Sequence, residues 1–213
     1  MTQQGNDSMA LIARLRRATC FHAMDLSPGE LSLAMSLVAL DVVARAAPHA
    51  PNVTPIAASA VFAGMVLRSR ALAVAVPISA LLLSDLVTGS YDWRIMGVVY
   101  AALALPALLA RWGRVRPMVV LAPLVLSSSL LFFATTNFAV WAFSGMYAHD
   151  LNGLVLCYVA ALPFFYNTVA GDALWTTLLF ATWWSAKVLL APNGIQCARQ
   201  TRFAPSPIGR GVE

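Results

Sequence analysis

Charged side chains are scarce in this sequence: they make up 11% of its 213 residues, whereas hydrophobic residues make up 60%. An ordinary soluble domain carries about 25% charged residues. The chain therefore has too few charges to cover a soluble surface, and its mean hydropathy of +0.73 leads to the same conclusion. We expect an all-α integral membrane protein.

Lysine is almost absent, since Lys187 is the single lysine among fourteen basic residues. The net charge of +5 could suggest a nucleic-acid partner, but the arginines stand in short clusters between apolar runs. Because such clusters form no continuous basic face, we expect no nucleic acid among the partners.

Cysteine and the common catalytic motifs are also missing or sparse. The three cysteines, Cys20, Cys157 and Cys197, show no CxxC or Cys/His spacing, so the sequence indicates neither a zinc site nor a disulfide framework. The chain has no HExxH, GxSxG, Walker A or GxGxxG pattern, so we expect no ATPase within it, no cofactor and no enzyme activity. Residues 14–17 are followed by a segment too short and too polar for the apolar core of a secretory signal.

What the sequence does contain is a series of apolar runs, which bilayer-spanning helices require. The chain has six of them, at residues 31–47, 54–67, 71–89, 95–110, 117–142 and 169–190. The second is short, at about 14 residues or roughly 21 Å of helix. A further short run, 151–165, contains Pro163.

The arginines predict the orientation of these runs. With six spans and a cytoplasmic N-terminus, twelve basic residues fall inside and two, Arg45 and Arg94, fall outside. If residues 151–165 also crossed, the split would become eight to six. We therefore predict six transmembrane helices with both termini cytoplasmic, and an extra short interfacial helix at 151–165 before the last span. The predicted division is a cytoplasmic N-terminal tail (1–29), a six-helix membrane domain (30–190) and a disordered cytoplasmic tail (191–213).

Polar side chains gather at the ends of the spans that this topology places outside. An aspartate at a helix centre costs about 2.5–3.5 kcal/mol on insertion, so Asp85, flanked by leucines, is expected to face a wet cavity or a neighbouring backbone. Arg45 follows Asp41 by four residues, and we expect these two to pair on one helix face. We further hypothesise that Asn52, Asp85, Asn137 and Asp172 form one hydrogen-bonded cluster. The full set of candidate substrate-binding residues is Asn52, Thr54, Asp85, Asn137, Asn167 and Asp172 as hydrogen-bonding groups, with Trp93, Trp141 and Tyr147 as flat apolar walls.

Each of these residues also has a purely structural reading. Asn52 or Thr54 could cap the second helix, whose entry is fixed by Pro51 and Pro55. Asp172 could interact with the dipole of the last helix, and the aromatic residues could form an interfacial belt.

Four blocks of sequence carry a resemblance to known proteins: PNVTPIAASAVFAG (51–64), VPISALLLSDLVTG (76–89), SSLLFFATTNFAVW (128–141) and CYVAALPFFYNTVAGDALWTTLLF (157–180). Together they resemble an uncharacterised family of small bacterial inner-membrane proteins. That family is similar in size and helix count to the substrate-binding S components of energy-coupling-factor (ECF) transporters.

The resemblance implies a function. S components are six-helix proteins of the bacterial cytoplasmic membrane that bind a vitamin or metal ion in a pocket open to the outside. They deliver it by reorienting, usually with a separate ATPase and transmembrane coupling module as partner. If the solute were a corrinoid, Cys157 would be the metal ligand. Ser32 and Ser36 are the nearest match to the docking motif of the first helix.

Three hypotheses follow. The first is a transport protein that binds a small solute of vitamin or metal type, with the solute and the lipid bilayer as partners. The alternative is a membrane-biogenesis or interaction protein without a solute, in which the polar residues only cap helices and hold loops. The third is an intramembrane enzyme that uses an aspartate dyad such as Asp85 and Asp172.

Overall fold

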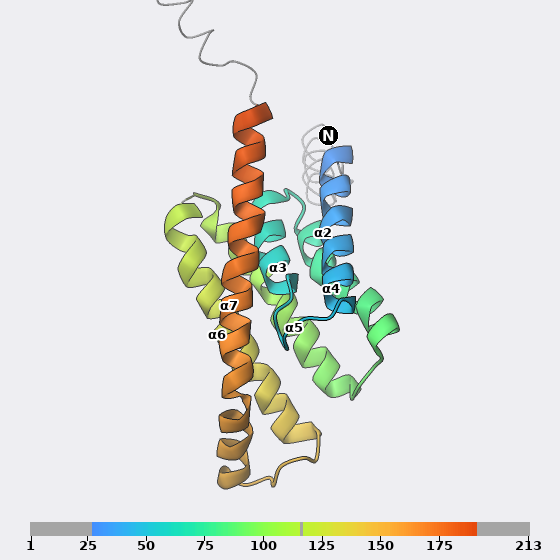
Figure 1. Ribbon diagram of the computed structural model, residues 1–213, viewed down its shortest axis with the longest axis vertical. Helices are drawn as coiled ribbons and strands as arrows, with labels where there is room; N and C mark the ends of the chain where they lie inside the picture. The colour runs from blue at the N-terminus through green and yellow to red at the C-terminus, as the bar shows by residue number, and fades with distance from the viewer. Residues whose placement is uncertain (1–26, 116, 191–213) are drawn as a thin grey trace, which may run out of the picture.

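The computed structural model describes residues 27–115 and 117–190, and within these residues it is all-helical. Along these described residues, six α-helices and one short 3-10 helix follow one another (Figure 1). Their bounds are α2 Pro28–Ala46, α3 Ile56–Val66, α4 Arg70–Thr88, α5 Trp93–Leu109, η1 Ala110–Val115, α6 Pro117–Phe143 and α7 Leu151–Leu190. The predicted tails lie outside the described residues, apart from residues 27–29, of which Pro28 and Gly29 already belong to α2.

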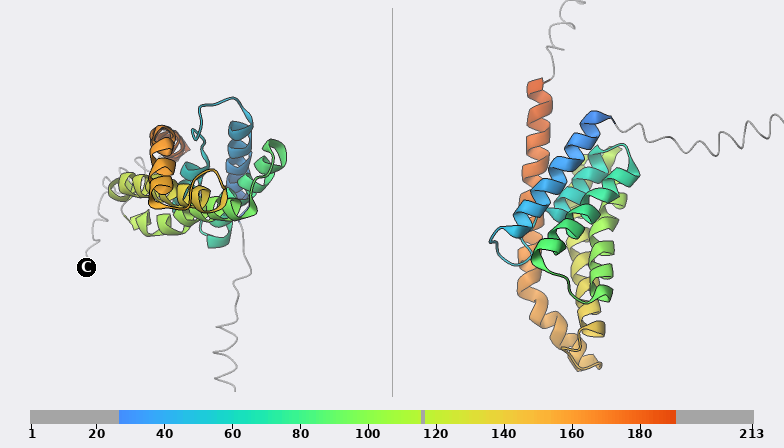
Figure 2. Two further views of the ribbon diagram at one scale, coloured as in Figure 1. Left: turned by 90° about the horizontal axis from the view of Figure 1, so that it is seen from below. Right: turned by 90° about the vertical axis from the view of Figure 1, so that its right-hand side faces the viewer.

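The six helices run alternately up and down the bundle. The first residues of α2 and the last residues of α7 lie at the same end, in both Figure 1 and the right-hand view of Figure 2. Three connecting segments, 47–55, 89–92 and 144–150, lie at the opposite end, which we call the loop end. This alternation brings together at one end the segments in which the sequence concentrates its polar residues.

Helix α3 is the centre of the bundle. It has 11 residues, and those from Ile56 to Met65 are all buried. A helix that is apolar on every side is stable only when other helices surround it, and α3 contacts each of the other helices. The approach to α5 is closest at Gly64, where an added Cβ would lie 2.2 Å from the Ala107 carbonyl oxygen.

Two arginines bind the C-terminal end of α3. Arg114 donates to the Gly64 carbonyl from Nε (3.1 Å) and Nη2 (2.9 Å), and Arg111 donates to the Arg68 carbonyl at 3.0 Å. The last carbonyls of a helix lack intrahelical partners, and cations there also favour the helix dipole. These contacts bind the Gly64 carbonyl in the last turn of α3 and the Arg68 carbonyl just beyond it, where this very short helix ends inside the bundle.

Four helical segments are long and apolar enough to cross a membrane: Arg70–Thr88, Trp93–Arg114, Val119–Phe143 and Leu151–Leu190. Helix α2 has 19 residues but carries Glu30, Asp41 and Arg45, and α3 is too short to span a bilayer unaided. The structure therefore supports a helical membrane protein with four candidate spans.

The prediction of a separate interfacial helix at 151–165 is wrong. These residues form the first part of α7, a single helix of 40 residues from Leu151 to Leu190. At 1.5 Å per residue it is about 60 Å long, twice the thickness of a hydrocarbon core. Pro163 lies inside it and does not end it. A proline removes one backbone hydrogen bond and more often kinks a membrane helix than breaks it. In the right-hand view of Figure 2 the lower part of α7 runs at an angle to its upper part.

Candidate functional site

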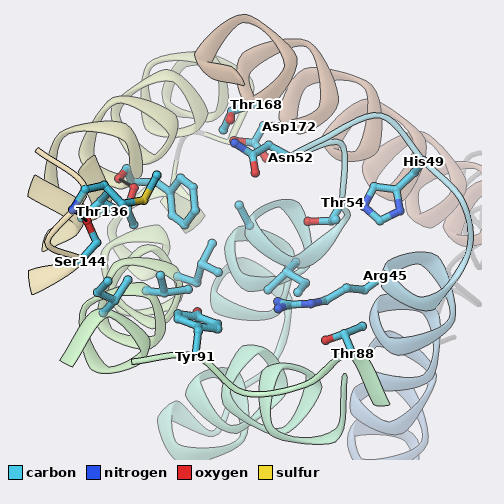
Figure 3. A pocket seen from close by; sticks show the side chains of 18 residues that line it. Arg45, His49, Asn52, Thr54, Thr88, Tyr91, Thr136, Ser144, Thr168 and Asp172 are labelled. Atoms are coloured by element: carbon cyan, nitrogen blue, oxygen red, sulfur yellow. Dashed lines mark hydrogen bonds between the residues drawn. The ribbon is translucent and has the colours of Figure 1, made fainter. Parts of the chain in front are cut away.

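A cavity of about 590 Å³ opens at the loop end of the bundle (Figure 3). Every α-helix from α2 to α7 and all three loop-end segments contribute to its wall. The polar lining residues are Arg45, His49, Asn52, Thr54, Thr88, Tyr91, Thr136, Ser144, Thr168 and Asp172. The apolar lining residues are Ile56, Ala57, Ile95, Val99, Leu103, Phe132, Val140 and Met146.

The cavity exists because α3 begins deep in the bundle. Residues 47–55 connect α2 to α3 without a helix, and prolines 48, 51 and 55 hold part of this segment in fixed backbone conformations. Asn52 has a φ of 65°, a left-handed conformation that asparagine tolerates better than most residues. The segment packs against α7 at Gly171, where an added Cβ would be 3.0 Å from the Val53 Cα. The first residues of α3 therefore form the floor of the cavity, and segment 47–55 forms part of its side.

One side of the cavity is built around an ion pair. Arg45 Nη2 is 2.6 Å from Asp85 Oδ1, and the Tyr100 hydroxyl donates to Asp85 Oδ2 at 2.9 Å. Asp85 itself is buried behind this contact, and the Arg45 guanidinium reaches toward the middle of the cavity in Figure 3. The charge of Asp85 is thus neutralised by Arg45, a residue that lines the cavity.

The expected pairing of Arg45 with Asp41 is wrong. Asp41 is fully buried and accepts a hydrogen bond from the Ser59 hydroxyl of α3 at 2.8 Å. Arg45 lies one turn further along α2, where its guanidinium pairs with Asp85 of α4. Spacing along one helix could not reveal that each side chain has a closer partner on another helix.

The other side of the cavity is built around Asp172 of α7. This residue is 3% exposed, and its Oδ2 accepts a hydrogen bond from the Ser129 hydroxyl of α6 at 2.6 Å. Asn52 lies beside Asp172 in Figure 3, while Arg45 and Tyr91 lie across the cavity. The site therefore has a carboxyl and an amide on one side, and a guanidinium and a phenol on the other.

Tyr91 supplies a hydroxyl that stays protonated. It lies in segment 89–92, and burial raises the pKa of its phenol above the usual 10.0; the Asp85 carboxylate raises this pKa further, while Arg45 lowers it. At neutral pH the phenol is therefore a hydrogen-bond donor and carries no charge.

Three of the predicted site residues line the cavity: Asn52, Thr54 and Asp172. Asp85 reaches it through Arg45. The other five, which do not line it, are Trp93, Asn137, Trp141, Tyr147 and Asn167.

The hypothesis of one hydrogen-bonded cluster is also wrong. Among the described residues, no hydrogen bond joins any two of Asn52, Asp85, Asn137 and Asp172. The Asn137 side chain donates to the Phe133 carbonyl of its own helix at 2.7 Å. Asp85, Asn137 and Asp172 each have another partner, and within the described residues Asp85 and Asp172 share no hydrogen bond that would make them a catalytic dyad.

The aromatic residues predicted as walls do not line the cavity. The Trp141 indole donates to the Ala148 carbonyl at 2.9 Å and packs on the His149 ring, which fixes segment 144–150. Trp93 is 77% exposed on the outside of the bundle. Phe132, from the middle of α6, is the aromatic side chain among the apolar lining residues.

Cys157 does not face the cavity. Its thiol is 2% exposed and its Sγ lies 3.4 Å from the Asn137 carbonyl oxygen, between α7 and α6. In the part of the chain that the structure describes, no three His, Cys, Asp or Glu side chains come close enough together to hold a metal ion. The location of Cys157 gives no support to a role as a cobalt ligand.

Sequence reasoning missed Arg45 as a site residue. A signal was present, because the topology placed Arg45 and Asp85 at similar depth near the outer ends of two spans, with opposite charge. Thr88, Thr136 and Thr168 were also missed as binding candidates, although they lie at the same end. Nothing in their spacing distinguishes a threonine that faces a cavity from one that faces lipid.

A second space of about 590 Å³ is a groove between α2 and α4. Ser79 is its one polar lining residue; the others are Leu31, Ala34, Met35, Val38, Ala39, Val42, Val43, Leu72, Ala75, Val76 and Leu83. Such a surface suits lipid tails, whereas recognition of a polar solute requires placed polar groups. The cavity at the loop end is the candidate site.

A helical membrane bundle with a polar and apolar cavity at one end is the class of protein that these observations define. A family model matches residues 27–193, and the chain belongs to that family, a protein family of unknown function (DUF6580). No curated protein and no solved structure matches the chain.

Proposed function

We propose that this protein crosses the bacterial cytoplasmic membrane six times, binds a small solute in the loop-end cavity from outside, and takes part in the transport of that solute. The observation that carries the proposal is the cavity itself. Its volume of about 590 Å³ lies within the range of about 300–1,000 Å³ that is usual for small-molecule sites. It also combines apolar side chains with polar groups that can orient a bound molecule.

The distribution of arginines supports an outward-facing loop end. Arg68, Arg70, Arg111 and Arg114 lie at the end opposite the loops, next to the N-terminal end of α2. Positive charge is enriched on the cytoplasmic side of membrane proteins. In this orientation both termini are cytoplasmic, and the second crossing is completed by α3 together with segment 47–55.

The proposal extends to the mode of action by similarity with S components. A solute held at one end of a compact bundle reaches the cytoplasm only if the bundle reorients or opens at its other end. A separate ATPase and coupling module is the proposed energy source. The proposed activity is binding and transfer, without chemical change to the solute.

A thermal-shift screen of the detergent-solubilised protein tests this function. Vitamins and other small water-soluble metabolites are added singly, and the melting temperature is measured. We expect at least one compound to raise it, because a ligand that binds only the folded state stabilises that state.

Two asparagine variants locate the binding. Asn52→Gly removes an amide that lines the cavity and keeps the left-handed backbone, whereas Asn137→Ala removes an amide that does not line it. The shift should weaken in the first and persist in the second. If no compound stabilises the wild-type protein, or if the shift survives in Asn52→Gly and is lost in Asn137→Ala, the proposed site is wrong.

A further inference from the structure

The charges around the cavity do not balance. Four titratable residues line it: Arg45, His49, Tyr91 and Asp172. The Arg45 charge is matched by Asp85, Tyr91 is neutral, and His49 lies in an exposed part of segment 47–55 with its Nδ1 2.7 Å from the Ala47 carbonyl oxygen. The carboxylate of Asp172 remains without a cation.

The hydrogen bonding of Asp172 leaves one of its carboxylate oxygens free to bind a cation. Its Oδ2 is bound to Ser129, and its Oδ1 has no hydrogen-bond partner among the described residues. A carboxylate that is 3% exposed is costly unless it is paired and hydrogen-bonded. Because Asp172 lines the cavity, a bound molecule can supply the missing charge and the missing donor.

The rest of the lining sets the shape of that molecule. Part of the cavity wall is apolar and suits an apolar group of the bound molecule. The residues of this part include Val99, Leu103, Phe132 and Val140. The Asn52 side chain beside Asp172 can accept a second N–H from the same group.

We infer that the solute of this cavity is a small organic cation, with a protonated amine at Asp172 and Asn52 and an apolar body against the side chains of α5 and α6. This inference rests on the proposed function and narrows it to one class of solute. The amine donates to Asp172 Oδ1, and its charge compensates the carboxylate that the protein leaves unmatched.

When no amine is bound, a proton can neutralise the Asp172 carboxylate. The Ser129 hydroxyl is 2.6 Å from Asp172 Oδ2 and 3.1 Å from the Val125 carbonyl oxygen, and it has one proton to donate. When Asp172 is protonated, it can donate to Ser129 while Ser129 donates to Val125. When Asp172 is ionised, Ser129 donates to it. Amine binding therefore competes with protonation and weakens as the pH falls.

The test uses matched probes that differ in charge. 2-Phenylethylamine, 2-phenylethanol and 3-phenylpropionate share one apolar body and are respectively a cation, a neutral molecule and an anion. Tryptamine, tryptophol and indole-3-propionate form a second set. Binding to the purified full-length protein in detergent is measured by thermal shift and calorimetry. We expect the amines to bind most tightly, and their affinity to fall as the pH is lowered.

Two aspartate variants assign the effect to one carboxyl. Asp172→Asn mimics the protonated acid and should weaken amine binding by about 30-fold or more, the usual loss when one partner of a buried charge pair is removed. Asp41→Asn is the matched control, because Asp41 is equally buried and bonded to a serine but does not line the cavity. It should bind amines as the wild type does. Adsorption of amines to detergent would be the same in both variants.

The outcomes separate the inference from the proposed function. Equal or tighter binding of the neutral or anionic probes, no binding of either amine, or unchanged amine binding in Asp172→Asn overturns the organic-cation assignment. The ranking of the probes needs no variant, so it decides the matter even if Asp172→Asn fails to fold. If an uncharged or anionic metabolite still stabilises the protein and Asn52→Gly removes that shift, the proposed function stands without this assignment.

Discussion

The close contact of α3 with α5 at Gly64 makes Gly64→Ala the most informative change to the bundle. The added Cβ would lie 2.2 Å from the Ala107 carbonyl oxygen and 2.8 Å from the Ala110 Cβ. Real Cβ atoms do not approach other atoms within 3.0 Å, so the two backbones must separate by about 0.8 Å. No side-chain rotation relieves this contact, because the obstructing atom belongs to the backbone of α5.

The expected loss of stability follows from this geometry. Overpacking a tight core costs about 1–3 kcal/mol, and occasionally more, when the backbone must shift. The Gly64 carbonyl also accepts two hydrogen bonds from Arg114, which the shift would lengthen. Replacing glycine by alanine in a helix otherwise gains about 1 kcal/mol, so we expect a net loss of about 1–2 kcal/mol.

Gly97→Ala is the control, since it changes a glycine of α5 that has nothing within 4 Å of the added Cβ. Both variants are purified in the same detergent, and their unfolding is followed by circular dichroism during heating and during titration with denaturing detergent. Gly97→Ala should be as stable as the wild type or slightly more so. If Gly64→Ala is as stable as Gly97→Ala, the central position of α3 is wrong.

Three further predictions concern orientation, the ion pair and the thiol. Alkaline phosphatase fused after Asp150 should be active and fused after Gln200 inactive; activity at both points, or only at the second, would contradict six spans with cytoplasmic ends. Asp85→Asn should destabilise the protein by about 1–3 kcal/mol in detergent unfolding, because the Arg45 side chain, 22% exposed, loses its counter-charge; the double change with Arg45→Met should cost less than the two single changes added, and strict additivity would exclude their coupling. Cys157→Ala should keep the thermal shift of any solute that the wild type binds, because the thiol faces α6; loss of that shift, or of a cobalt-thiolate absorption band with a corrinoid, would place the thiol in the site.

Much of the helical framework can be predicted from hydropathy. Long apolar runs are almost bound to become helices in a bilayer, where backbone groups need internal partners. The second run was predicted at 54–67 and α3 spans Ile56–Val66, so even this short helix was located within two residues. The extent of α7 could not be predicted in the same way. A proline reads as a break in the sequence, but whether it ends a helix depends on the packing around it, and at Pro163 it does not.

The sequence predicted at which end of the bundle the candidate site lies, but only some of the residues that line it. Gathering of polar residues at one end follows from the topology, and that is where the cavity lies. Which of those residues face the cavity depends on how each helix is rotated, and hydropathy does not report rotation in helices that are apolar on most sides. Asn137 illustrates this, since its depth is right but its amide bonds to its own helix.

Arg45 illustrates a second feature that the sequence did not predict, an ion pair between two helices. Its spacing from Asp41 is ideal for an intrahelical pair, but the energy of such exposed pairs is small, about 0.2–0.5 kcal/mol. A partner on another helix that is partly buried outweighs it, and Asp85 is that partner. Contacts of this kind become visible only when the neighbours of each helix are known.

Labelling with a membrane-impermeant thiol reagent tests the central proposal, that the loop-end cavity is open to the outside of the cell. In a cysteine-free background, Thr136→Cys places a thiol in the cavity wall. Thr176→Cys places one at a buried position of α7 that does not line this cavity. In intact cells we predict that the reagent modifies position 136 and leaves position 176 unmodified. No reaction at 136 from outside, with reaction there only in inverted vesicles, would contradict the account.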